Sequence, residues 1–137
     1  RQSLAEINCD YDHGTGHGIG SFLSVHEGPQ RIAKYQGQID GFIKDGMIIS
    51  NEPGYYKKGE YGIRIENLLI SSFLSSEKMY FETISWAPID LDLIDTSLLT
   101  GKEIRWLNSY HKDVYDRISP NLNQEEKEWL RKVTTSL

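Results

Sequence analysis

The sequence contains a single cysteine, Cys9, among 137 residues. One cysteine excludes an intrachain disulfide and fits the reducing cytoplasm, where we expect the protein to reside. Basic residues are not in excess, because 15 Lys and Arg stand against 20 Asp and Glu and give a formal net charge of -5. Without a basic footprint, nucleic acid is not an expected partner. No apolar run approaches the roughly 20 residues of a membrane helix, so we expect no membrane span either.

The residue types and the spacing of apolar residues change along the chain. Residues 1–8 resemble the tail of a helix, the next stretch is rich in glycine, and residues 31–45 are polar and predict a loop. Apolar runs separated by turn residues then predict strands, and helical spacing follows after Thr100 and Asn123, both typical helix caps. The predicted class is α+β, an antiparallel sheet followed by helices in one domain. The strands are expected at residues 22–26, 47–50, 61–73 and 78–89, with a hairpin turn at 57–60.

Three of the four histidines lie in one glycine-rich run, DHGTGHGIGSFLSVHEGP, at His13, His17 and His26. The motifs NEPGYY, which holds Glu52, and GIRIENLL, which holds Glu66, follow it. His17, Glu52 and Glu66 offer one nitrogen and two oxygen ligands, a set suited to Mn, Fe, Co or Zn. Scattered histidines and glutamates are commonly surface residues. Here, however, Glu52 lies in a tight Asn-Glu-Pro-Gly turn, and Glu66 interrupts an apolar strand.

The backbone around these residues supports a ligand site. Arg64 and Glu66 are two residues apart in a predicted strand, so they project to the same face. A cross-strand ion pair would explain them, but several acids beside imidazoles are costly to bury without a cation. The histidine spacing does not match the helical HExxH zinc motif, so only one histidine need be a ligand. Glycines at 14, 16, 18 and 20 are expected to let the backbone approach a ligand and to adopt positive φ.

Together these motifs resemble a known family. HGTGHGIGSFLSVHEGP, NEPGYY and GIRIEN are similar to the second half of the catalytic domain of Xaa-Pro aminopeptidases (aminopeptidase P), which are pita-bread metallopeptidases. The segment FETISWAPIDLDLIDTSLLTGKEIRWLNSYH resembles the C-terminal extension of the long cytosolic branch of that family. The resemblance implies the second half of a pita-bread fold. A metal-site half-domain would span residues 1–90 and a helical extension residues 91–137, with the N-terminal domains outside the chain.

The resemblance also implies a metal site. His17 and Glu52 would be ligands of one metal, and Glu66 would be a carboxylate that bridges two metals, usually manganese. Glu52 is in addition the expected proton carrier.

The remaining implied roles concern substrate. His13 and His26 would contact the substrate and stabilise the transition state, while Tyr56 and Arg64 match positions of a hydrogen-bonded network beside the metals. The family releases the N-terminal residue from peptides with proline in second position, and its full-length enzymes are expected to be homodimers.

One departure limits these expectations. The family needs two further aspartates, and only twelve residues precede His13, where Asp10 and Asp12 adjoin the histidine motif. We therefore expect a C-terminal fragment that holds one metal or none and is inactive alone. The alternatives are a non-catalytic pita-bread binding protein, another pita-bread peptidase such as prolidase, and a complete mononuclear hydrolase with a His-Glu-Glu site.

Overall fold

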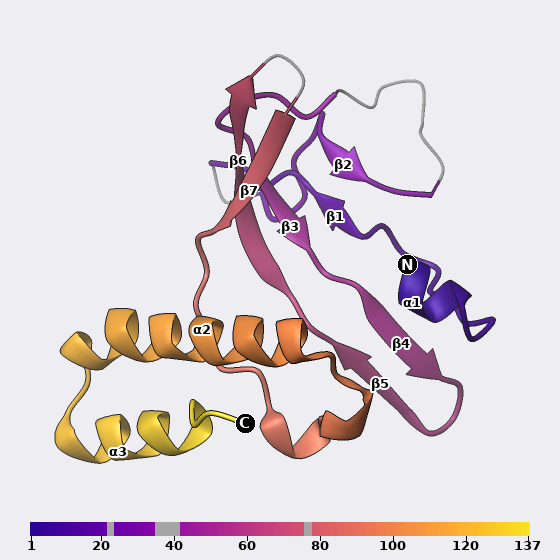
Figure 1. The fold of residues 1–137 in the computed structure, drawn as a ribbon. Coiled ribbons are helices and arrows are strands. Elements are labelled where there is room, and N and C mark those ends of the chain that lie inside the picture. Colours follow the sequence, from indigo (N-terminus) through magenta and orange to yellow (C-terminus); the bar gives the residue numbers. More distant parts are fainter. Residues whose placement is uncertain (22–23, 35–41, 76–77) are drawn as a thin grey trace. The chain divides into compact units, whose positions relative to one another are not determined.

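The computed structural model describes residues 1–21, 24–34, 42–75 and 78–137. The chain separates into two compact units, Arg1–Ser85 and Trp86–Leu137. The first unit contains the strands and the second contains the long helices (Figure 1). Among the helices that the structure describes, none combines the length and the apolarity needed to cross a membrane.

A three-stranded antiparallel sheet forms the centre of the first unit, in the order β3 (Ile48–Asn51), β6 (Asn67–Ser75), β7 (Lys78–Thr83). A turn at Gly46, with φ of 74°, leads into β3. In β3, Ile49 and Ser50 are fully buried. The strand expected at residues 78–89 ends earlier, at Thr83.

A second antiparallel pair, β4 (Gly54–Lys57) and β5 (Tyr61–Arg64), forms the predicted hairpin with its turn at residues 58–60. The single strand expected at 61–73 is wrong, because Ile65 and Glu66 separate β5 from β6. Its two halves pair with different partners, β5 with β4 and β6 with β3. The break lies opposite Glu52-Pro53, where proline has no N–H to continue the ladder.

Short elements bring the N-terminal segment onto β3. They are α1 (Gln2–Ala5), β1 (Gly16–His17) and β2 (Arg31–Ile32), and β1 pairs antiparallel with β2. The Glu52 N–H donates to the Thr15 carbonyl at 2.7 Å, which fixes β1 beside the end of β3. β2 lies in a stretch that the sequence predicted as loop. The expected strand at 22–26 is not formed by residues 24–26, and residues 22–23 lie outside the described part of the chain.

The glycines of this segment act differently from the prediction. Positive φ among the described glycines is limited to Gly46 and Gly59, so the glycines at 14, 16, 18 and 20 do not use it. Gly16 is needed for close packing of the chain on itself, because a Cβ there would lie 2.0 Å from the Ser50 carbonyl oxygen. The missing side chain therefore lets β1 approach β3.

The second unit is helical. Its elements are η1 (Leu91–Leu93), η2 (Thr96–Leu98), α2 (Gly101–Ile118), η3 (Ser119–Asn121) and α3 (Gln124–Val133). Both long helices begin at the caps expected at Thr100 and Asn123, and each of these caps forms a capping box. Four buried side chains form the core of this unit: Leu107, Tyr110, Val114 and Leu130.

Aromatic residues of this unit differ in exposure. Trp106 of α2 is 57% exposed, and Trp129 of α3 is 58% exposed. His111 is a packed histidine, since it is 1% exposed and its Nε2 accepts from the Ile89 N–H at 3.1 Å.

Candidate functional site

A cavity of about 640 Å³ lies in the first unit. Its wall combines imidazole, carboxylate and guanidinium groups from β1, from the loops beside it and from the ends of β3 and β5. Five of the seven residues predicted as site residues line it: His13, His17, His26, Glu52 and Arg64.

His17 and Glu52 form the centre of this wall. His17 Nε2 lies 3.0 Å from Glu52 Oε1, and His17 Nδ1 lies 2.9 Å from the Gly18 carbonyl oxygen. Because a carbonyl oxygen only accepts, Nδ1 carries a proton, and Nε2 is the ring atom that faces the carboxylate. Two lone pairs at this separation need a proton or a cation between them. A backbone carbonyl that fixes the Nδ1 proton is also typical of histidines that bind metals.

Ser50 holds the pair in place. Its hydroxyl donates to Glu52 Oε1 at 2.8 Å and accepts from the His17 backbone N–H at 3.0 Å. Glu52 is 8% exposed, so its carboxylate is largely removed from water. The sequence did not identify Ser50, although its position in the predicted strand, two residues before Glu52, was a usable signal.

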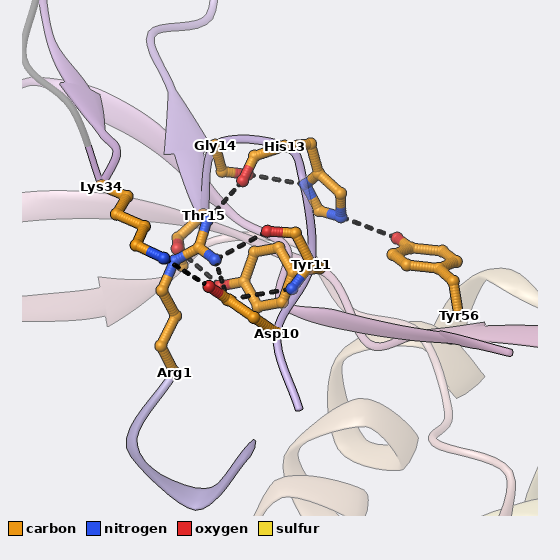
Figure 2. A network of polar contacts seen from close by, with 8 residues as sticks. All are labelled: Arg1, Asp10, Tyr11, His13, Gly14, Thr15, Lys34 and Tyr56. Atoms are coloured by element: carbon orange, nitrogen blue, oxygen red, sulfur yellow. Dashed lines mark hydrogen bonds and ion pairs between the residues drawn. The ribbon is translucent and has the colours of Figure 1, made fainter. Parts of the chain in front are cut away.

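A hydrogen-bonded chain runs along the other side of the cavity. Arg64 Nε donates to Tyr56 Oη at 2.9 Å, and Tyr56 Oη lies 2.7 Å from His13 Nε2. His13 Nδ1 donates to the Gly14 carbonyl at 2.7 Å, so Nε2 is the ring nitrogen that is bonded to the tyrosine hydroxyl. Figure 2 shows this link between His13 and Tyr56.

Arg64 joins the two halves of the wall. Its Nη1 lies 3.2 Å from Glu52 Oε2. The hydrogen bond to Tyr56 is the main cause that raises the pKa of Arg64, with smaller contributions from the charges of Glu52 and Glu66. His26 completes the group by packing its ring on that of His17, with centroids 4.1 Å apart. The structure thus brings His13, Tyr56, Arg64, Glu52, His17 and His26 into one connected cluster.

Glu66 is the predicted residue that stays apart. It is exposed, in the short break between β5 and β6, and within the described part of the chain no three His, Cys, Asp or Glu side chains form a group able to hold a metal. The carboxylates of Glu52 and Glu66 would repel each other unless a cation lay between them. Arg64 already supplies one positive charge to Glu52. The residues present therefore fit a divalent ion in part: His17 and Glu52 form an adjacent nitrogen and oxygen pair.

Sequence reasoning also missed a polar network at the rim of the cavity. Arg1, Asp10, Tyr11 and Lys34 meet there beside His13 (Figure 2). Charged residues are common on protein surfaces, so these gave no signal in the sequence. Their partners are also distant along the chain, since Asp10 and Lys34 are 24 residues apart.

Comparisons with known proteins agree with these observations. The sequence pattern described as "Metallopeptidase family M24" matches residues 1–71, and the pattern described as "C-terminal region of peptidase M24" matches residues 77–137. The chain is 45% identical over 146 residues to a probable Xaa-Pro aminopeptidase P of Coprinopsis cinerea. It is 44% identical over 141 residues to aminopeptidase P1 of Arabidopsis thaliana.

One solved structure covers all of this chain. It is the X-prolyl aminopeptidase of Caenorhabditis elegans, described as a cytosolic enzyme with a di-nuclear active site, with a TM-score of 0.88 and 34% identity. This likeness confirms the predicted α+β class, with the antiparallel sheets and C-terminal helices of the pita-bread fold. The chain spans only 24% and 22% of the two relatives and 23% of the solved chain.

Proposed function

The chain belongs to metallopeptidase family M24, and on that premise we propose that it carries part of the catalytic site of an Xaa-Pro aminopeptidase. The proposed reaction releases the N-terminal residue from peptides with proline in second position. The observation that carries this proposal is the single cavity in which His17 and Glu52 meet the chain of His13, Tyr56 and Arg64. The relatives named above support the same substrate class.

We propose His17, Glu52 and Glu66 as the metal ligands that this chain contributes, with two manganese ions in the full-length enzyme. His17 and Glu52 are already adjacent, while Glu66 would have to move toward them. The family's further aspartates would come from residues outside this chain. Divalent ions in such a site supply a Lewis acid and lower the pKa of water, so that it is a nucleophile near neutral pH.

The proposed catalytic residues have separate tasks. Glu52 is the proposed proton carrier, and its ion pair with Arg64 together with the Ser50 hydroxyl holds the carboxylate in one orientation. His13 is proposed to contact the peptide, and Tyr56 keeps its Nε2 at a fixed point of the wall. His26 is the second proposed substrate contact, and it is placed by its ring contact with His17.

Two properties of the full-length protein are proposed from the resemblance. One is residence in the cytoplasm, which the description of the worm enzyme as cytosolic supports. The other is assembly as a homodimer, which rests on the family resemblance alone.

The decisive experiment uses the full-length protein with manganese and a peptide that has proline in second position. Glu52→Gln should lower kcat by about 10²–10⁴-fold, the range that a proton-transfer residue contributes. The matched control is Glu60→Gln, which removes the exposed partner of Lys57 in the hairpin turn and should leave kcat unchanged. A wild-type protein with no Xaa-Pro hydrolysis, or a Glu52→Gln variant with normal turnover, would contradict the proposed function.

A further inference from the structure

We infer that Arg1 is a positioning residue for His13, and that Asp10 and Tyr11 are the groups through which it acts. The inference rests on the proposed function, because it assigns His13 a role in the peptidase reaction.

The side chain of Arg1 reaches the segment just before the histidine motif. Its Nη1 bonds to Asp10 Oδ1 and donates to the Tyr11 carbonyl at 2.8 Å, while its Nη2 donates to the His13 carbonyl at 2.5 Å. Figure 2 shows the guanidinium at the centre of these contacts. One planar group therefore fixes the backbone on both sides of residue 12.

Tyr11 transmits the same restraint to the imidazole ring. The Arg1 guanidinium lies over the Tyr11 ring at 3.8 Å from the centroid, and the Tyr11 and His13 rings lie 4.6 Å apart. Tyr11 is 4% exposed, and its hydroxyl lies 2.6 Å from Thr15 Oγ1. A buried, hydrogen-bonded ring cannot turn freely, so the face it offers to His13 is fixed.

Asp10 keeps Arg1 in this place. Its second oxygen accepts from Lys34 Nζ at 2.9 Å, so one carboxylate holds two cations. The hydrogen bond from Lys34 and that from the Tyr11 N–H hold the pKa of Asp10 well below its usual range. The Arg1 side chain is 23% exposed, and a partly buried guanidinium is stable only with its hydrogen bonds made.

The restraint matters because the hydrogen bonds of the His13 side chain, among the described residues, are made by its two ring nitrogens and do not fix its backbone. Gly14 and Tyr56 set the direction of the ring, whereas Arg1 sets the position of the backbone that carries it. Arg1, Asp10 and Tyr11 line the same cavity as His13. A displacement of about 1 Å at a catalytic group can lower a rate by about 10²-fold.

The test is a double-mutant cycle in the full-length enzyme, with manganese and an Xaa-Pro peptide. Arg1→Met keeps the apolar stem and removes every donor. We expect kcat to fall about 10- to 100-fold with KM little changed, because only a group that acts in the transition state is displaced. In a His13→Ala background the same substitution should have no further effect on kcat. Lys57→Met, which removes the exposed ion pair with Glu60, is the matched control and should leave kcat unchanged in both backgrounds.

Equal losses from Arg1→Met with and without His13 would overturn the inference, because the residue would then act on folding or on the whole site. Circular dichroism and metal content measure the folded fraction. If Arg1→Met does not fold, Asp10→Asn serves in the same cycle, since it removes the charge that holds Arg1 and leaves the backbone contacts. If neither variant folds, Arg1 is a structural residue and the inference is wrong.

A second readout separates this inference from the proposed function. In a crystal structure of Arg1→Met we expect the distance from His13 Nε2 to Tyr56 Oη to exceed the 2.7 Å of the unaltered protein. An unmoved His13 contradicts the positioning role even if the enzyme is active. A wild-type enzyme without peptidase activity contradicts the proposed function, while a displaced His13 would still support the positioning role.

Discussion

Two glycines, Gly54 and Gly62, leave the space in which the Tyr56 ring lies. A Cβ on Gly54 would lie 2.4 Å from Tyr56 Oη, and a Cβ on Gly62 would lie 2.8 Å from Tyr56 Cδ1. Both distances are shorter than any ordinary carbon contact, so the tyrosine ring occupies the space that side chains at 54 and 62 would need. The hydroxyl between Arg64 and His13 therefore depends on residues that make no polar contact with it.

The first prediction follows from this packing. Gly54→Ala should displace the Tyr56 hydroxyl, break its bonds to His13 and Arg64, and lower kcat of the full-length enzyme by about 10-fold or more. Gly101→Ala is the control, because a Cβ there would make an ordinary 3.4 Å contact with Arg105. Steady-state kinetics on an Xaa-Pro peptide measures both variants. Normal kinetics for Gly54→Ala would show that catalysis does not depend on the position of the Tyr56 hydroxyl.

At this scale the sequence identified most residues of the cluster around the cavity. His13, His17 and His26 could be grouped by spacing, and Glu52, Tyr56 and Arg64 by the motifs that follow. Ser50 was overlooked because serine in a buried strand is common, and Arg1 because its contacts with Asp10, Tyr11 and His13 are identified only in the tertiary structure. The resemblance named ligands, but it could not show that Glu66 lies apart from Glu52.

Among the elements, helix α2 depends most clearly on one local device. Thr100 Oγ1 accepts from the Glu103 N–H at 3.3 Å, and Glu103 Oε2 accepts from the Thr100 N–H at 2.8 Å. Thr100→Ala should lower the free energy of unfolding of the 137-residue chain by about 1 kcal/mol, the usual loss for an N-cap. Urea denaturation followed by circular dichroism measures it. An unchanged midpoint would mean that packing alone starts the helix.

The same cap predicts a pH dependence. Hydrogen bonds from the Thr100 hydroxyl and N–H lower the pKa of Glu103 from its ordinary value of 4.5. A lowered folded pKa adds stability that is present above pH 4.5 and is lost as the pH falls through the folded value. Glu103→Gln keeps a capping side chain but cannot titrate. The difference between the urea midpoints of wild type and Glu103→Gln should therefore narrow on acidification, and a constant difference would contradict this assignment.

Elements were predictable where the signal was local. The helix caps at Thr100 and Asn123 and the hairpin turn at Gly59 depend on neighbouring residues, and all three were predicted. The break at Ile65 depends on a change of strand partner, which alternation within residues 61–73 cannot reveal. β2 was missed because its two residues pair with β1 across a long connection.

For the molecule as a whole, the chain contains only part of the proposed site. With manganese added, the purified 137-residue chain should release no N-terminal residue from an Xaa-Pro peptide, because among its described residues His17 and Glu52 alone meet as candidate ligands. Amino-acid release measured by chromatography provides the assay, with the full-length enzyme as positive control. Robust turnover by the short chain would show that a three-residue site is sufficient.

The chain also exposes apolar side chains on its strands. They include Ile63, Phe73, Leu74, Tyr80 and Phe81, which are between 40% and 71% exposed. Unpaired strand edges and apolar faces of this kind promote association. Light scattering of the short chain should therefore show oligomers whose mass rises with concentration. A monomer at high concentration would show that the exposed side chains do not form an adhesive surface.

The hairpin of β4 and β5 contains an exposed site for proteolytic cleavage. Its turn contains the exposed Lys58 beside Gly59, so trypsin should cleave here before it attacks the ladder. Tyr56 and Arg64 would then lie on separate polypeptides, joined by the antiparallel pairing of β4 with β5 and by their own hydrogen bond. After limited digestion, the full-length enzyme should elute from gel filtration as one particle and give two bands on a denaturing gel. The product would be a split protein whose two pieces share one hydrogen-bonded site.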